Sequence, residues 1–256
     1  PKVSIVDMRD ELKMGNRSIF SNKLKTLIED RLRKHEQVML FMNRRGYSSF
    51  VSCRSCGEAI KCKHCDVTMT LHNNNKLVCH YCGYSIDLPK VCPSCGSKYI
   101  ANFGTGTQKL EAMTREVFPS AKVLRMDTDS VSKKNSANDM IRDFARGDAD
   151  ILIGTQMIVK GHDFDNVTLV GIMAADTSLY VSNYNSAQRT FELLTQAAGR
   201  AGRAKSGEAV IQTYKPENYA IVAAAAQDYK KYFENEIAYR KLGGYPPVCH
   251  MLTVMF

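Results

Sequence analysis

The sequence predicts an α/β domain, a parallel sheet covered by helices on both faces, which carries a small metal-binding insert. Two observations support this fold class. Beyond residue 106, short apolar runs typical of buried strands alternate with longer patterns typical of helices. In addition, eight of the nine cysteines lie between Cys53 and Cys95. That segment has few large apolar residues, so we expect bound metal to hold its core together.

Before the cysteines, the pattern predicts one helix and one strand. Residues 1–15 are expected to form a connecting segment. From Arg17 to Lys34, apolar residues recur on one helical stripe with many Lys and Arg residues opposite, which predicts an amphipathic helix. Val38 to Met42 is a continuous apolar run, short enough for a buried parallel strand.

After the cysteines, strands and helices alternate regularly. Strands are predicted at Lys122–Met126, Asp150–Gly154, Val167–Met173 and Ala209–Thr213, and helices at Thr107–Val117, Lys133–Ala145, Ser186–Ala198 and Pro216–Arg240, the last one broken. Tyr245-Pro246-Pro247 ends the alternation, and the apolar tail from Met251 to Phe256 is typical of a first strand. We therefore expect a linker and the first part of the α/β domain in 1–51, the insert in 52–98, the remainder in 99–243, and the start of a truncated C-terminal domain in 244–256.

Composition excludes some classes of protein and favours others. Hydrophobic residues make up 44% of the 256 residues and charged residues 24%, as in ordinary globular domains. No apolar run is long enough to span a membrane, and no signal peptide is evident, so we expect a cytoplasmic protein without a membrane partner. Two Zn²⁺ ions and eight thiolates would bring the formal charge of +9 to about +5. The remaining positive charge favours nucleic acid as a partner.

The cysteines form four Cys-x-x-Cys pairs, a spacing that lets two thiolates hold one tetrahedral ion. Eight thiolates therefore predict two zinc sites, each with four cysteine ligands. Gly57, Gly83 and Gly96 each follow the second cysteine of a pair, where glycine permits the positive-φ turn of a zinc knuckle. The fourth pair is followed by Asp66, which also tolerates this turn.

The pairs are expected to be nested rather than sequential. Val67–Leu71 alternates like a strand, Asn73-Asn74-Asn75 is typical of a turn, and Lys76–Val78 returns. This hairpin predicts one site formed by Cys62, Cys65, Cys79 and Cys82, and leaves Cys53, Cys56, Cys92 and Cys95 for the other. His64 and His80 are expected not to be ligands. Redox-active dithiols and a chaperone-type zinc domain are competing interpretations.

Further motifs lie in the α/β domain. The stretch from Gln196 to Arg203, Gln-Ala-Ala-Gly-Arg-Ala-Gly-Arg, places two arginines three residues apart at a helix end, and the planar guanidinium suits phosphate oxygens. Thr155 directly follows a buried strand, at a position where ligand-binding loops begin. Lys160-Gly161-His162-Asp163 follows it. By itself the arginine pair could also be a plain basic helix terminus.

In combination these motifs resemble motifs V and VI of superfamily 2 helicases, and Val38 to Tyr47 resembles motif IV. Four Cys-x-x-Cys pairs directly after motif IV make the chain similar to the second, RecA-like helicase lobe of the PriA family of replication-restart DNA helicases. The resemblance covers essentially the whole chain. It implies an ATP-dependent 3′-to-5′ DNA helicase that recognises stalled or branched forks and restarts replication through primosome assembly.

The resemblance also implies roles for individual residues. Arg200 and Arg203 would contact the ATP phosphates, with Arg203 as the arginine finger. Gln196, Gly161 and Asp163 would take part in nucleotide binding. A further group would lie toward the DNA backbone, namely Thr155, Asn43, Arg44 and Arg45. The implied cofactors are two Zn²⁺ ions, with ATP and Mg²⁺ in the intact enzyme, and the implied partners are forked and single-stranded DNA, primosome and helicase-loading proteins, and single-stranded DNA-binding protein.

The sequence departs from a complete helicase in one respect that matters for function. It contains no Gly-x-x-x-x-Gly-Lys-Ser/Thr and no Asp-Glu-x-His, and Gly104-Thr105-Gly106-Thr107 lacks the lysine of a P-loop. We therefore expect a fragment that supplies the arginine side of an ATP site and has no ATPase activity alone. The alternative is a zinc-stabilised module that binds DNA or proteins without motor activity. The ninth cysteine, Cys249, is expected to be a core residue.

Overall fold

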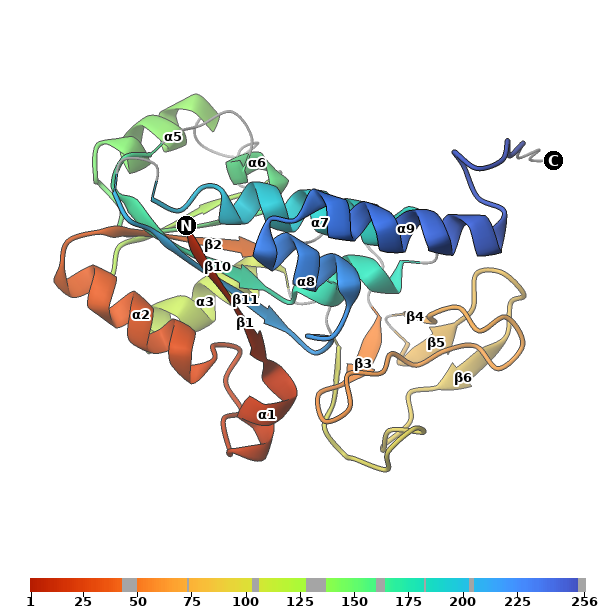
Figure 1. The fold of residues 1–256 in the computed structure, drawn as a ribbon. Coiled ribbons are helices and arrows are strands. Elements are labelled where there is room, and N and C mark those ends of the chain that lie inside the picture. Colours follow the sequence, from red (N-terminus) through yellow and green to blue (C-terminus); the bar gives the residue numbers. More distant parts are fainter. Residues whose placement is uncertain are drawn as a thin grey trace.

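The computed structural model describes residues 1–42, 50–72, 74–102, 106–127, 137–159, 164–181, 183–202 and 205–252. Within these ranges a sheet of six parallel strands forms the centre of the molecule (Figure 1). In spatial order the strands are β1 (Lys2–Asp7), β11 (Glu208–Thr213), β10 (Val167–Met173), β2 (Gln37–Met42), β9 (Ile151–Gly154) and β8 (Val123–Met126). Because all pairs are parallel, the carboxyl ends of the strands meet at one edge of the sheet.

Helices cover both faces of the sheet, which confirms the predicted fold class (Figure 1). One face carries α2 (Asn22–Arg33) and α3 (Thr107–Val117), and the other carries α5 (Ala137–Ala145), α6 (Gln156–Val159), α7 (Ser186–Ala198), α8 (Tyr219–Ala226) and α9 (Tyr229–Gly243). β2 illustrates how one strand serves both cores. Val38 and Leu40 pack in the cluster with α2, and Met39 and Phe41 pack in the cluster with α7, because successive side chains of a strand point to opposite faces.

The expectation of a connecting segment over residues 1–15 is wrong. Lys2–Asp7 is the edge strand β1, which pairs with β11 from Lys2 opposite Glu208 to Asp7 opposite Thr213, and α1 (Met8–Lys13) follows it. Val3 and Ile5 pack on the α7 side of the sheet. The partner strand lies about two hundred residues further along the chain, so local periodicity does not reveal the pairing.

Most other predicted elements occur within a few residues of their expected bounds. Helix α2 begins at Asn22 rather than at Arg17, because the Ser21 side chain accepts a hydrogen bond from the amide of Leu24 and caps the helix there. The helix expected over 216–240 is broken at Gln227, which has a φ of 55° and ends α8. Residues 128–136 and 253–256 lie outside the described residues, and Met251 and Leu252 are not in a strand.

The cysteine segment forms its own small sheets beside the main one (Figure 1). β3 (Val51–Cys53) pairs antiparallel with β7 (Ile100–Asn102), so the segment leaves and returns at one place. β4 (Thr70–Leu71), β5 (Lys76–Val78) and β6 (Ser85–Asp87) form an antiparallel meander that contains the expected hairpin. Among the helices within the described ranges, none combines the length and the apolar character needed to cross a membrane.

Candidate metal centre and nucleotide-facing segment

The structure gathers the eight cysteines into two clusters of four. The first cluster contains Cys53, Cys56, Cys92 and Cys95, and the second contains Cys62, Cys65, Cys79 and Cys82. Within each cluster the sulfur atoms all lie within 4.8 Å of one another. The arrangement is nested, because the β4–β5 hairpin folds the two inner pairs together and the β3–β7 pairing does the same for the outer pairs.

The sulfur–sulfur distances fit tetrahedral metal binding. Cys53 and Cys95 are 3.6 Å apart, Cys56 and Cys92 are 3.8 Å apart, and the Cys62–Cys82 distance in the second cluster is 3.7 Å. Four sulfurs at a zinc–sulfur distance of about 2.3 Å would be separated by about 3.8 Å, whereas a disulfide bond is about 2.05 Å long. Soft thiolate ligands in this geometry favour zinc.

Each cysteine pair forms the same tight turn. The residue after the second cysteine donates its amide to the carbonyl oxygen of the first cysteine, at 2.8 to 2.9 Å in all four knuckles. Its φ is positive each time, namely 77° at Gly57, 74° at Gly83, 71° at Gly96 and 52° at Asp66. The turn that the sequence predicts after each pair is therefore present, and it orients backbone N–H groups toward the sulfurs.

The protein environment distributes charge unevenly among the thiols. Burial raises the pKa of Cys79 and of Cys92, but hydrogen bonds from two backbone N–H groups within each knuckle and from neighbouring thiols outweigh it and lower the pKa of both thiols to about 7. Burial raises the pKa of Cys56 to about 12, and the Cys82 thiol is the main cause of a similar rise to about 12 at Cys65. A divalent cation would offset the repulsion between neighbouring thiolates. Because the thiols must lose their protons to bind it, metal affinity should rise with pH.

The arginine segment begins where α7 ends. Gly199 caps the helix, Arg200 is half-buried and Ala201 is buried. Gly202, with a φ of 70°, donates its amide to the carbonyl oxygen of Val167 at 2.8 Å. Val167 opens β10, so this hydrogen bond fixes the segment at the amino end of that strand. Gln196 lies exposed on the last turn of α7.

Residues 164–166 lead into β10 and follow, in the sequence, the stretch that contains Gly161 and Asp163. Both positions, like Arg203 and Asn43–Arg45, lie outside the described residues. Thr155 is described. It follows β9 at the carboxyl edge of the sheet, half-buried, and its carbonyl oxygen accepts from Ile158 in the first turn of α6. β2 ends at Met42 on the same edge, so Thr155 and the arginine segment lie at opposite edges of the sheet.

Sequence reasoning missed an acidic group beside the start of α3. Gly106 caps that helix without a side-chain hydrogen bond, as expected for a plain cap. The buried Asp127 carboxylate accepts a hydrogen bond from the Thr107 hydroxyl and pairs with Arg125, which also binds Glu111 at 2.8 Å. A carboxylate therefore already occupies the surroundings of this helix N-terminus, where a free phosphate would otherwise be stabilised.

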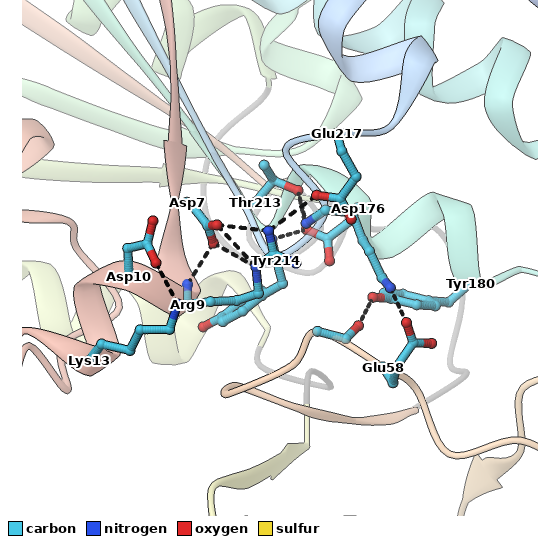
Figure 2. A network of polar contacts seen from close by, with 12 residues as sticks. Asp7, Arg9, Asp10, Lys13, Glu58, Asp176, Tyr180, Thr213, Tyr214 and Glu217 are labelled. Carbon is cyan, nitrogen blue, oxygen red and sulfur yellow. Dashed lines mark hydrogen bonds and ion pairs between the residues drawn. The ribbon is translucent and has the colours of Figure 1, made fainter. Parts of the chain in front are cut away.

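A second missed group is Asp176, in the short helix η1 (Ala175–Tyr180) that follows β10. Its carboxylate accepts from the Thr213 hydroxyl at 3.0 Å and from the Tyr214 amide at 3.2 Å, which joins the carboxyl ends of β10 and β11 (Figure 2). Burial raises the pKa of Asp176, and the hydrogen bonds from Tyr214 and Thr213 only partly offset this. An acidic residue three positions after a buried strand was the available sequence signal.

The elevated pKa predicts a pH dependence of stability. Because the ionised carboxylate is disfavoured in the folded state, the free energy of unfolding should fall as pH rises from the ordinary value of 3.8 through the raised pKa of Asp176. Asp176→Asn keeps an oxygen acceptor and removes the charge, so the free energy of unfolding of this variant should decline less over the same pH range. Urea unfolding of both chains at several pH values measures it, and an unchanged slope would contradict the assignment.

Comparisons with known proteins agree with this architecture. The sequence profile of the PriA DNA helicase Cys-rich region domain matches residues 62–86, and that of the helicase conserved C-terminal domain matches residues 97–205. The replication restart protein PriA of Bacillus subtilis is 50% identical to this chain over 256 residues, which are 99% of the chain and 32% of the relative. The corresponding protein of Synechocystis is 47% identical over 96% of the chain and 30% of its own length.

A more distant relative, the replication restart protein PriA of Chlamydia pneumoniae, is 40% identical over the whole chain and 35% of its own length. This chain thus spans about a third of the length of the relatives that it matches. Identity extends along nearly the whole chain, and the cysteine-rich region that carries the second metal cluster matches a profile specific to one family. The chain therefore belongs to the PriA family of replication restart proteins.

Proposed function

We propose that this chain forms the second helicase lobe, with its zinc insert, of an ATP-dependent 3′-to-5′ DNA helicase that restarts replication at stalled or branched forks. One observation carries the proposal. The hydrogen bond from Gly202 to Val167 holds the described part of the arginine segment at the amino end of β10. This supports a nucleotide site there, to which we assign Gly161 and Asp163 from the sequence stretch that precedes β10.

Arg200 and Arg203 have the chemistry needed at an ATP site. Their guanidinium groups would stabilise the charge on the transferring γ-phosphoryl group, with Arg203 as the finger. Gln196 would help to orient the nucleotide from the exposed side of α7, together with Gly161 and Asp163. ATP supplies the free energy for translocation, and Mg²⁺ would neutralise part of the phosphate charge. We assign the phosphate-cradling loop to another lobe, because this sequence contains no Gly-x-x-x-x-Gly-Lys-Ser/Thr.

The opposite edge of the sheet is proposed to face DNA. Thr155 and the Asn43–Arg45 stretch follow neighbouring strands there, β9 and β2, which pair directly. Hydroxyl, amide and guanidinium groups are suited to phosphate contacts that do not depend on base sequence. The insert over 52–98, bounded by the remainder of the lobe in 1–51 and 99–243, would contact forked DNA, primosome and helicase-loading proteins or single-stranded DNA-binding protein. Thiolate ligands fit the reducing conditions of the cytoplasm.

The proposal is tested by comparing this chain with a protein of the length of its relatives. The longer protein should hydrolyse ATP in the presence of forked DNA and displace a labelled strand, while residues 1–256 alone should give no ATP turnover above background. DNA-stimulated turnover by the chain alone would contradict the placement of the active site. A longer protein that binds forked DNA without hydrolysing ATP would support a zinc-stabilised interaction module instead.

A further inference from the structure

The two metal clusters differ in how they contact the sheet. The first knuckle, residues 53–58, contacts Tyr180 at the end of η1 and Tyr214 just after β11. Figure 2 shows Glu58 of this knuckle beside Tyr180. Arg54 in the knuckle donates three hydrogen bonds, from Nε to the Tyr214 hydroxyl at 3.1 Å, from Nη1 to the Arg17 carbonyl at 2.9 Å and from Nη2 to the Ser18 carbonyl at 3.0 Å. The Arg54 guanidinium group thus connects Tyr214, just after β11, with the segment that precedes α2.

The backbone of the same knuckle makes further contacts with the lobe. The carbonyl oxygen of Gly57 accepts a hydrogen bond from the Tyr180 hydroxyl at the end of η1, and Glu58 forms an ion pair with Lys215 just after β11. A Cβ added at Gly57 would clash with the carbonyl oxygen of Tyr214 and would lie 3.2 Å from the Tyr214 Cβ. Glycine is needed here both for the positive φ and for this close approach.

The other glycine knuckles lack this packing. Gly83 and Gly96 adopt nearly the same φ, but an added Cβ would meet no heavy atom within 4 Å in either case. At the position equivalent to Arg54, the second knuckle carries Lys63, whose ammonium lies 4.8 Å from the ring centroid of Tyr84 within the insert. The knuckle at Gly57 is therefore docked on the lobe, whereas the knuckles at Gly83 and Gly96 are not, and the two kinds can be compared within one chain.

The docked knuckle is linked onward to α7. Tyr180, which binds Gly57, ends η1, and Ser178 of η1 shares a 2.5 Å hydrogen bond with Thr190 of α7. The Ser186 hydroxyl in the first turn of α7 donates to the Val181 carbonyl at 2.6 Å. A displaced knuckle would therefore release η1 first and then loosen the start of α7.

We propose that the first metal cluster is a structural part of the sheet lobe, holding η1 and the end of β11 in place through the knuckle over 53–58, with Arg54 as its anchor. The second cluster stabilises only the outer meander of β4, β5 and β6. Metal at the first site is thus required for the conformation of η1 and of the end of β11, whereas metal at the second site is required for the insert alone.

Two matched pairs of variants test this in the full chain, by hydrogen exchange with mass spectrometry and by zinc analysis. Cys95 and Cys82 are the exposed last ligands of the first and second clusters. Cys95→Ser should accelerate exchange in residues 175–181 and 213–215 by roughly 10- to 100-fold, because hydrogen bonds to charged groups and buried partners are lost. Cys82→Ser should accelerate exchange in residues 70–87 and leave those two segments within about twofold of the parent.

The glycine variants test the docking without removing a ligand. Gly57→Ala should retain two zinc ions, accelerate exchange in the same two segments and lower Tm by roughly 5 °C, whereas Gly83→Ala and Gly96→Ala, which strain only the turn, should lower it by about 2–4 °C at most. Should Gly57→Ala fail to fold, Arg54→Ala against Lys63→Ala gives the same comparison. The proposal would be overturned if Cys95→Ser and Cys82→Ser accelerated exchange equally in residues 175–181 and 213–215. It would also be overturned if Gly57→Ala had the same effects as Gly83→Ala and Gly96→Ala, or Arg54→Ala the same effects as Lys63→Ala.

Discussion

Removal of both metal ions is expected to unfold residues 54–98 while the six-stranded sheet stays folded. Among the described residues, the buried cluster of the insert consists of Val51, Ile60, Met69 and Leu77 together with the ligands Cys62 and Cys79. So small a core supplies little stability of its own, whereas a structural zinc site contributes on the order of 10–16 kcal/mol. The sheet has large cores on both faces and does not depend on metal for them.

The measurement is hydrogen exchange before and after treatment with a strong chelator, with the released zinc counted. We expect two zinc ions per chain, exchange in residues 54–98 at the rate of an unstructured peptide, and retained protection in β2, β9 and β10. Cys249 lies outside both clusters, so Cys249→Ser is the matched control and should still bind two ions. A metal-free chain with a fully protected insert would contradict the metal-dependent fold.

The sequence predicts those parts of the fold whose signals are local. The pattern over Thr107–Val117 and Ser186–Ala198 gives both helices with the bounds that the structure shows, since their apolar stripes and ends are set by neighbouring residues. The nested grouping of the cysteines is also predictable, because a turn at Asn73–Asn75 brings the inner pairs together. Positive φ at Gly57 follows from its place in the knuckle.

Other features depend on contacts between residues far apart in the chain. β1 is an edge strand only because β11, some two hundred residues later, offers it a partner. In the sequence, Arg54 is simply a basic residue within a zinc knuckle. Nothing near it indicates that its guanidinium group donates hydrogen bonds to the Tyr214 hydroxyl and the Ser18 carbonyl oxygen. Asp127 likewise becomes relevant to α3 only after β8 is placed beside that helix.

In a protein of the relatives' length, Arg203→Ala is expected to lower DNA-stimulated ATP turnover by roughly 10³- to 10⁵-fold, the range typical of an arginine finger. The loss should appear in kcat, because the guanidinium group stabilises charge that develops as the phosphoryl group transfers. Arg203→Lys should recover little of the activity, since an ammonium lacks the planar fork that binds two phosphate oxygens. DNA binding should be unchanged, because the arginine segment and Thr155 lie at opposite edges of the sheet.

Arg189 provides the matched control for this prediction. It is an exposed arginine at the opposite end of α7, three turns before the arginine segment. Arg189→Ala removes the same charge from the helix that leads into the arginine segment and should leave ATP turnover within about twofold, as surface substitutions usually change stability little. If Arg189→Ala and Arg203→Ala reduced turnover equally, the effect would belong to the overall positive charge of this part of the chain. If neither reduced it, the nucleotide would not lie beside Gly202 and Val167, and the proposed motor role of this lobe would fail with it.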